Sequence, residues 1–294
     1  MPVRARLLAA ALAALAALPA AGCRRWSEPV QLGGSAKDDG PDPFDTALAQ
    51  GELAFAERGE PARLQEALGA FSRAAALRPR DAGAQVWIAR AEAFRALATQ
   101  DPARAREAWL ASARAAERAL RRIAPAFAAS VDRGDDPAAA AAGVTALGAE
   151  PLYLLAQGTM RSAQLTGYAA VLAVKDPCLA MMARAAELDE RVDAAGPHRA
   201  LGAWRAGLPI AAGGGATAAR AHFDRARALH PTDLLARVAE AETLAVLLQD
   251  AARFDALLAE VEAFALEQDP PRAPENRIAK RLAAELGTRR PRLF

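Results

Sequence analysis

The chain has 294 residues, and its 37 lysines and arginines nearly balance its 35 aspartates and glutamates. This balance, without a dense basic patch interleaved with aromatic residues, argues against nucleic acid as a partner. Hydrophobic residues make up 53% of the chain, with much alanine and leucine and few β-branched residues. We therefore predict an all-α protein with no strand of consequence.

The first 22 residues have the pattern of a secretory signal. Arg4 and Arg6 are followed by an uncharged apolar run from Leu7 to Leu18. A bilayer-spanning helix needs about 20 apolar residues, so this run is too short to cross a membrane and is typical of a signal peptide. We predict that residues 1–22 are a lipoprotein signal peptide.

The cysteine that follows the signal is the predicted anchor. Small residues precede Cys23, as in the lipobox of bacterial lipoproteins, although Ala20 stands where that box usually has leucine. We predict a lipid on Cys23; the alternative is a secreted protein whose cysteine has no such role. Residues 23–45 are polar and rich in glycine, proline and aspartate, which predicts a lipid-anchored flexible tether. Residues 46–294 form the predicted helical domain.

The expected helices follow from hydrophobic periodicity and from proline and glycine breaks. Their ranges are 46–57, 61–77, 82–98, 103–124, 151–173, 177–190, 197–204, 216–229, 233–248, 251–267 and 274–288. Residues 131–136 look irregular, and the alanine tract 138–148 reads either as a short helix or as a loose connection. The helix over 151–173 is apolar on most faces and should lie at the centre of the fold. Asp176 and Pro177 are expected to begin the next helix.

One spaced signature occurs twice along the chain. Small, aromatic, small and proline residues stand at Ala67, Phe71, Ala74 and Pro79, and again at Ala219, Phe223, Ala226 and Pro231. The first three positions share one face of a helix, as in the second helix of a tetratricopeptide unit. Weaker copies begin at Ala105 and Cys178. The pattern predicts degenerate tetratricopeptide-like helical hairpins in one superhelical domain, an architecture that mostly binds other molecules.

Catalytic and metal-binding signatures are weak. The three histidines have no ligand spacing, the Gly213–Gly215 run lacks a following lysine, and no serine lies in a nucleophile elbow. We predict no enzyme, no metal site and no cofactor. The candidate ligand-contacting residues are Trp204, His198, Tyr153, Met160 and Tyr168; for the aromatic residues and methionine the alternative is ordinary core packing.

The C-terminal half resembles a known family. Its elements are the glycine–proline turn at 196–197, the G-x-W-x-A-x-x-P segment at 202–209, the glycine run, and the A-x-x-x-F-x-x-A helix that follows. The apolar stretch EPLYLLAQGTMRSAQL and the tail ENRIAKRLAAEL, which contains Asn276, Ala279 and Lys280, complete the likeness. Together they resemble the T component of tripartite ATP-independent periplasmic (TRAP) transporters.

The resemblance implies a periplasmic lipoprotein whose helical bundle encloses a hole or cleft. It also implies association with a solute-binding P protein, a small hydrophobic organic acid as ligand, and a homotrimer. The lipid anchor would hold the protein on the cell membrane or the outer membrane. The alternative is a tetratricopeptide-type interaction scaffold in envelope assembly, because such folds specify no function by themselves.

Overall fold

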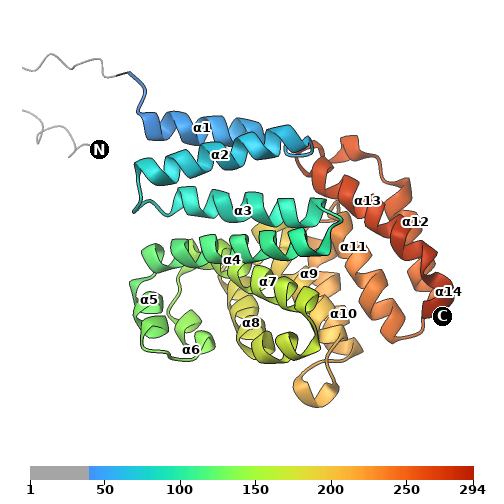
Figure 1. The fold of residues 1–294 in the computed structure, drawn as a ribbon. Coiled ribbons are helices and arrows are strands. Elements are labelled where there is room, and N and C mark those ends of the chain that lie inside the picture. Colours follow the sequence, from blue (N-terminus) through green and yellow to red (C-terminus); the bar gives the residue numbers. More distant parts are fainter. Residues whose placement is uncertain (1–39) are drawn as a thin grey trace, which may run out of the picture. The chain divides into compact units, whose positions relative to one another are not determined.

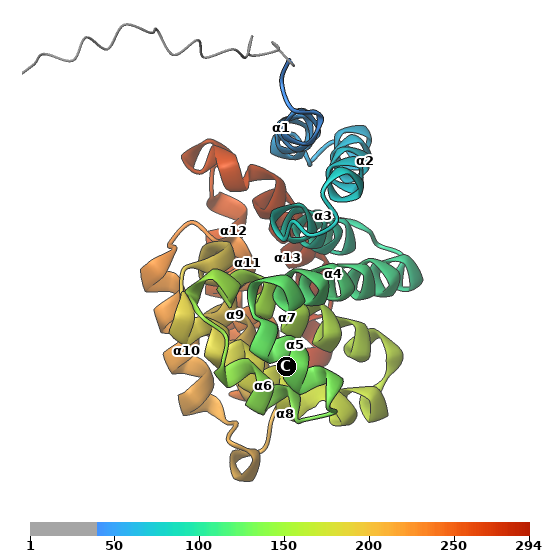
Figure 2. The ribbon, with the colours of Figure 1, turned by 90° about the vertical axis from the view of Figure 1, so that its left-hand side faces the viewer.

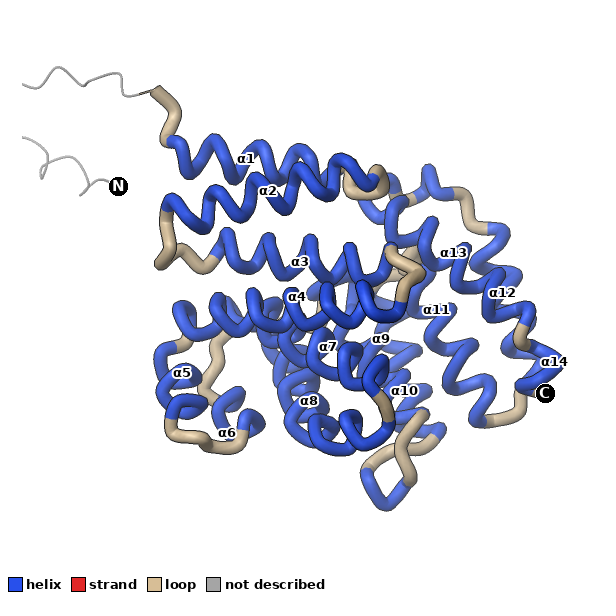
Figure 3. Tube along the Cα trace, in the orientation of Figure 1, coloured by secondary structure: helices blue, strands red, loops and turns tan. Residues whose placement is uncertain are grey.

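The computed structural model describes residues 40–294, of which 41–294 form one compact unit. The predicted signal peptide, Cys23 and most of the predicted tether lie outside the described residues. The first half contains α1 (Pro43–Ala56), α2 (Pro61–Leu77), α3 (Gly83–Ala98), α4 (Pro102–Ile123), α5 (Pro125–Asp132), α6 (Pro137–Ala142), η1 (Ala146–Gly148) and α7 (Ala149–Thr166). The second contains α8 (Tyr168–Leu188), α9 (Val192–Ala206), η2 (Ile210–Ala212), α10 (Ala216–Leu229), α11 (Leu234–Glu240), η3 (Ala241–Ala245), α12 (Ala251–Ala263), η4 (Leu266–Gln268), η5 (Pro270–Arg272), α13 (Ala273–Thr288) and α14 (Arg290–Leu293). No strand occurs within residues 40–294, so the all-α prediction is confirmed (Figure 3).

Aspartate followed by proline begins several of the helices. The carboxylates of Asp42, Asp101 and Asp136 accept hydrogen bonds from backbone N–H groups two residues on, at 2.7, 2.9 and 3.1 Å. Each cap satisfies a donor that the helix itself leaves unpaired, and the proline has no N–H to lose. The helix predicted over 103–124 is confirmed, with its first residue at Pro102.

The helices pack mainly against their neighbours in the chain. The pairs α1–α2, α3–α4, α4–α7, α7–α8 and α9–α10 have the most extensive contacts (Figures 1 and 2). Helix α13 returns to contact α3, and Arg281 Nη2 donates to the carbonyl of Leu97 at 3.3 Å. The last helices therefore close the fold against the first ones, with α7 packed between α3, α4, α8 and α9.

The two complete signature copies lie on equivalent helices, α2 and α10. Phe71 and Phe223 are buried, and so are the small residues Ala67, Ala74, Ala219 and Ala226. Each ring packs over a glycine of the preceding helix: a Cβ on Gly51 would lie 2.4 Å from Phe71, and one on Gly202 would lie 3.0 Å from Phe223. Pro79 and Pro231 follow the ends of their helices. The predicted buried face is confirmed; the tetratricopeptide assignment itself stays a prediction.

Several predicted boundaries were wrong. The helix predicted over 151–173 ends at Thr166, because Gly167 has a φ of +137°, which lies outside the helical range. The next helix, α8, continues through Pro177 instead of beginning there. This proline leaves the Ala173 carbonyl without a helical N–H, a cost that the helix tolerates.

Smaller differences occur elsewhere in the domain. The irregular segment predicted over 131–136 contains the end of α5, and the alanine tract 138–148 divides into α6 and η1. The segment 233–248 becomes α11 followed by a π-helical turn, η3, and α12 ends at Ala263 rather than at 267. The predicted tether boundary at 45 lies inside α1. The turn chemistry of these short segments is too weak to fix their ends from sequence alone.

Candidate functional site

Three adjoining cavities surround α7. Cavity 1, of about 390 Å³, lies between α7, α8, the end of α9 and η3. Cavity 2, of about 230 Å³, lies between α1, α3, α7 and the start of α13, and cavity 3, of about 640 Å³, lies between α3, α4, α7 and α13. Cavities 1 and 3 share Arg161, Gln164 and Glu242, whereas cavities 1 and 2 share Gln157. Helix α7 is therefore the common wall of all three.

Cavity 1 combines an apolar wall with polar groups. Its apolar side chains include Met160, Val171, Leu179, Trp204 and Leu208. Gln164, Gly207 and Glu242 also line it and are exposed, so the cavity opens to solvent on this side. Ligand sites in proteins combine apolar contact surface with polar groups that orient the bound molecule, and cavity 1 offers both in similar measure.

Arg161 is the cation of cavity 1 that has no carboxylate partner within ion-pair distance among the described residues. Its Nη1 donates one long hydrogen bond, 3.4 Å, to Gln164. Desolvation lowers the pKa of Arg161, while the Glu242 charge acts to raise it and the Arg199 charge to lower it further. The group remains a guanidinium at any physiological pH. Its charge faces a cavity and is not cancelled by an ion pair.

The other cations around the cavities already have partners. In cavity 1, Lys175 Nζ lies 2.5 Å from Asp176. In cavity 2, Arg58 donates to Glu275 at 2.7 Å. Likewise, the Arg90 guanidinium contacts both oxygens of Glu150. In cavity 3, Arg281 lies 2.9 Å from Glu285. Arg161, which lines cavities 1 and 3, is thus the cation of these cavities whose charge no ion pair within the described residues cancels.

The π-helical turn η3 supplies the wall opposite α7. Glu242 and Thr243 of this turn line cavity 1, and Glu242 also lines cavity 3. Single π-helical turns inside helices often mark functional sites, because they redirect side chains out of the regular register. The Glu242 carboxylate accepts a hydrogen bond at 3.1 Å from Arg289, which lies just beyond α13.

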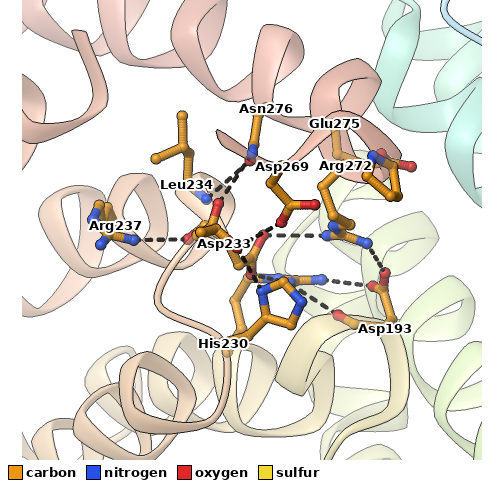
Figure 4. Close-up of polar contacts among 12 residues, drawn as sticks. Asp193, His230, Asp233, Leu234, Arg237, Asp269, Arg272, Glu275 and Asn276 are labelled. Carbon is orange, nitrogen blue, oxygen red and sulfur yellow. Dashed lines mark hydrogen bonds and ion pairs between the residues drawn. The ribbon is translucent and has the colours of Figure 1, made fainter. Parts of the chain in front are cut away.

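A buried network of charges separates cavity 1 from cavity 2 (Figure 4). Arg199, in the wall of cavity 1, contacts Asp233 and donates to Asp193 at 2.7 Å. Arg272, in the wall of cavity 2, donates to Asp193 at 2.7 Å and to Asp233 at 3.2 Å. The Tyr153 hydroxyl donates to Asp193 at 2.7 Å. Two arginines thus bridge two aspartates, which fixes α7, α9, α11 and the start of α13 relative to one another.

The backbone at Asp193 adopts an uncommon conformation to join this network. Asp193, Ala194 and Ala195 have φ values of +46°, +55° and +61°, the left-handed region that residues with a Cβ rarely occupy. Burial acts to raise the pKa of Asp193, but Arg272, Arg199 and the Tyr153 hydroxyl together hold it well below the usual range. Burial and the Asp193 charge raise the pKa of Tyr153, so its hydroxyl stays a donor. The ion pairs hold the left-handed turn in place.

Asn276 supports the network from α13 (Figure 4). Its fully buried side chain accepts from the Leu234 N–H at 3.1 Å and donates to the Thr232 carbonyl at 3.0 Å. These bonds hold the turn that presents Asp233. The asparagine noted in the sequence tail therefore has a structural role.

The structure separates the five predicted ligand contacts. Trp204 and Met160 line cavity 1. Tyr153 is fully buried and belongs to the charge network. The expectation that Tyr168 lines a cavity was wrong: it begins α8 and is 78% exposed, because Gly167 turns the chain outward before it. His198 packs against His222, at 3.0 Å between their Nδ1 atoms, and lies away from the three cavities.

The histidine pair makes the stability of the protein sensitive to acid. Burial lowers the pKa of His222 from its ordinary value near 6.5 to about 4, and the charges of His198 and Arg205 act in the same direction. Between about pH 4 and pH 6.5 the folded protein binds fewer protons at His222 than the unfolded chain does. The contribution of His222 to stability therefore declines as pH falls from about 6.5 towards about 4. We expect the thermal midpoint to fall between pH 7.5 and pH 5, and by less in His222→Gln. Equal falls in both proteins, followed by circular dichroism, would refute this origin.

Sequence reasoning missed Arg161 and the partners of Tyr153. A signal for Arg161 existed, since it is the lone basic residue in the stretch 150–165. No such signal existed for the charged residues of the network, because spacing along the chain does not show which residues lie close together in space. These residues are Asp193, Arg199, Asp233 and Arg272.

None of the helices in residues 40–294 combines the length and apolarity needed to cross a bilayer. Among known proteins, a model of the family described as TRAP transporter T-component matches residues 55–294. The match extends well beyond the C-terminal half, to the end of α1. No curated protein matches the chain.

Proposed function

The chain belongs to the TRAP transporter T-component family, and on that premise we propose that it is the periplasmic lipoprotein of such an uptake system. In this proposal it docks a solute-binding P protein and holds a small hydrophobic organic acid. Family membership makes the chain an accessory of a transporter. The single observation that carries the ligand proposal is cavity 1, with its apolar lining and the unpaired guanidinium of Arg161.

The chemistry of cavity 1 supports an organic acid. Its volume of about 390 Å³ lies at the lower end of the range for small-molecule sites. Met160, Val171, Leu179, Trp204 and Leu208 offer apolar contact to a hydrocarbon body. A guanidinium pairs well with a carboxylate, since its N–H groups match the two oxygens.

Exposed apolar residues near the opening of cavity 1 are the proposed docking surface for the P protein. The exposed fractions are 43% for Leu165, 78% for Tyr168 and 47% for Leu172. These residues are close in sequence to Gln164 and Val171, which line cavity 1. Aromatic side chains such as that of Tyr168 are enriched in the centres of protein interfaces, and the buried centre of an interface is depleted of charged residues. A receptor docked there would lie directly over the ligand.

The anchor and the assembly complete the proposal. Acyl chains on Cys23 would hold the protein on the periplasmic face of the cell membrane or the outer membrane, with residues 23–45 as the tether. A homotrimer follows from the family resemblance. The competing function is a tetratricopeptide-type scaffold for envelope assembly, which the helical-hairpin packing would also suit.

Capture from the envelope tests the proposal. The full chain, tagged at its C-terminus, is extracted in mild detergent from its own organism, and its partners are identified by mass spectrometry. We expect a TRAP-type solute-binding protein with the wild-type chain and with Leu147→Asp, a control at a residue 82% exposed on η1. Tyr168→Asp combined with Leu172→Asp should lose it. Recovery of outer-membrane assembly proteins without a solute receptor would instead establish the scaffold.

A further inference from the structure

The junction of cavities 1 and 3 carries one cation and one anion. Arg161, on α7, and Glu242, on η3, both line both cavities. They influence one another electrostatically, yet they do not form an ion pair. Their separation is notable because a guanidinium and a carboxylate facing one cavity ordinarily attract, and nothing on α7 holds Arg161 back except a 3.4 Å bond to Gln164.

Glu242 has another partner, Arg289. Its Nη1 donates to Glu242 at 3.1 Å from the end of α13, with both side chains about half exposed. The Glu242 carboxylate therefore pairs with Arg289 near the surface. The Arg161 guanidinium, which faces the cavity, forms no ion pair within the described residues. Arg289, in this arrangement, is a positioning residue that acts through Glu242.

We propose that Arg161 binds one carboxylate of the solute and that Glu242, held by Arg289, restricts cavity 1 to solutes with a single negative charge. This inference rests on the proposed function and names its substrate class: amphiphilic monocarboxylates. A dicarboxylate would place its second charge either near Glu242, where like charges repel, or among the apolar side chains, where an ion loses its hydration. A neutral molecule of the same shape would leave Arg161 without a partner.

The three residues should differ in how strongly they affect binding. Arg161 supplies a charge-assisted hydrogen bond in a partly desolvated site, so its removal should matter most. Glu242 acts by repulsion and should alter selectivity more than affinity. The Glu242–Arg289 pair is exposed, and exposed pairs are weak, so loss of Arg289 should have the smallest effect.

The test compares three probes of one length: octanoate, octanedioate and octanol. Binding to the full chain in detergent is measured by calorimetry. We expect wild type to bind octanoate most tightly. Arg161→Gln should weaken octanoate binding about 10- to 100-fold and remove its advantage over octanol. Arg63→Gln, which removes a cation paired with Glu57 on a helix outside the three cavities, is the matched control and should change binding less than about twofold.

Two further variants separate the proposal from a general loss of structure. Glu242→Gln should strengthen octanedioate binding while leaving octanoate nearly unchanged. Arg289→Ala should weaken octanoate binding by up to about fivefold, because it frees Glu242 to compete for Arg161, and adding Glu242→Gln should restore it. A merely structural role for Arg289 would not be rescued in this way. Equal binding of octanoate by Arg161→Gln and wild type, or no binding of any probe by wild type, would overturn the inference. Capture of the P protein is measured separately, so it would still decide the proposed function.

Discussion

Replacing Asp233 by alanine is expected to lower the free energy of unfolding by about 3–5 kcal/mol. Asp233 is fully buried and contacts both Arg199 and Arg272. Removing it leaves two guanidinium groups in the protein interior with one carboxylate between them. An unpaired buried charge costs far more than the original pair gains, which is why loss of a single partner has so large an effect.

Asp255→Ala provides the matched control for this prediction. Asp255 also forms an ion pair, with Arg290 at 2.7 Å, but its side chain is 49% exposed. Such pairs contribute about 0–1 kcal/mol, so the control should stay within that range. Urea unfolding followed by circular dichroism gives both values. If Asp233→Ala lost no more stability than Asp255→Ala, the network would not be what holds α9, α11 and α13 together.

Replacing Phe71 by alanine is expected to cost about 3–5 kcal/mol of stability, because it leaves a cavity in the core. The ring is fully buried, lies stacked at 5.2 Å on Trp87, and covers Gly51. A glycine cannot fill the space that the ring vacates, and the neighbouring helices close only in part. Leu53→Ala on α1 is the control, since Leu53 is 66% exposed. Equal unfolding midpoints for the two variants would show that the signature face is not the packing core of α1 and α2.

Much of the fold was predictable from sequence, and Phe71 shows why. Small and aromatic residues at helical spacing can be buried together only on one face, so the pattern identifies the packed side of α2 and α10. Asp101 and Pro102 likewise fix the start of α4, because capping is a local interaction. Predictions that depend on neighbours in sequence were mostly correct.

Predictions that depend on long-range structure were less reliable. Glycine and proline both often end helices. Here Gly167 ends a helix and Pro177 does not, and the sequence alone does not distinguish the two cases. The left-handed turn at Asp193 exists because Arg199 and Arg272 hold it, and Arg272 is far away in the chain. Arg161 is the one basic residue of the stretch 150–165, and Glu242, which lines the same two cavities, joins it only in the folded domain.

Cavity 1, the proposed ligand site, and the proposed docking surface both include residues of α7 and α8 on either side of the turn between these helices. Site-specific crosslinking in the intact envelope tests this most directly. A photoreactive residue is placed at Tyr168, and at Leu147 on η1 as a control of similar exposure. We predict a crosslink to a TRAP-type solute-binding protein from position 168 and none from position 147. Crosslinks to that receptor from position 147 alone, or to envelope-assembly proteins alone, would contradict the account.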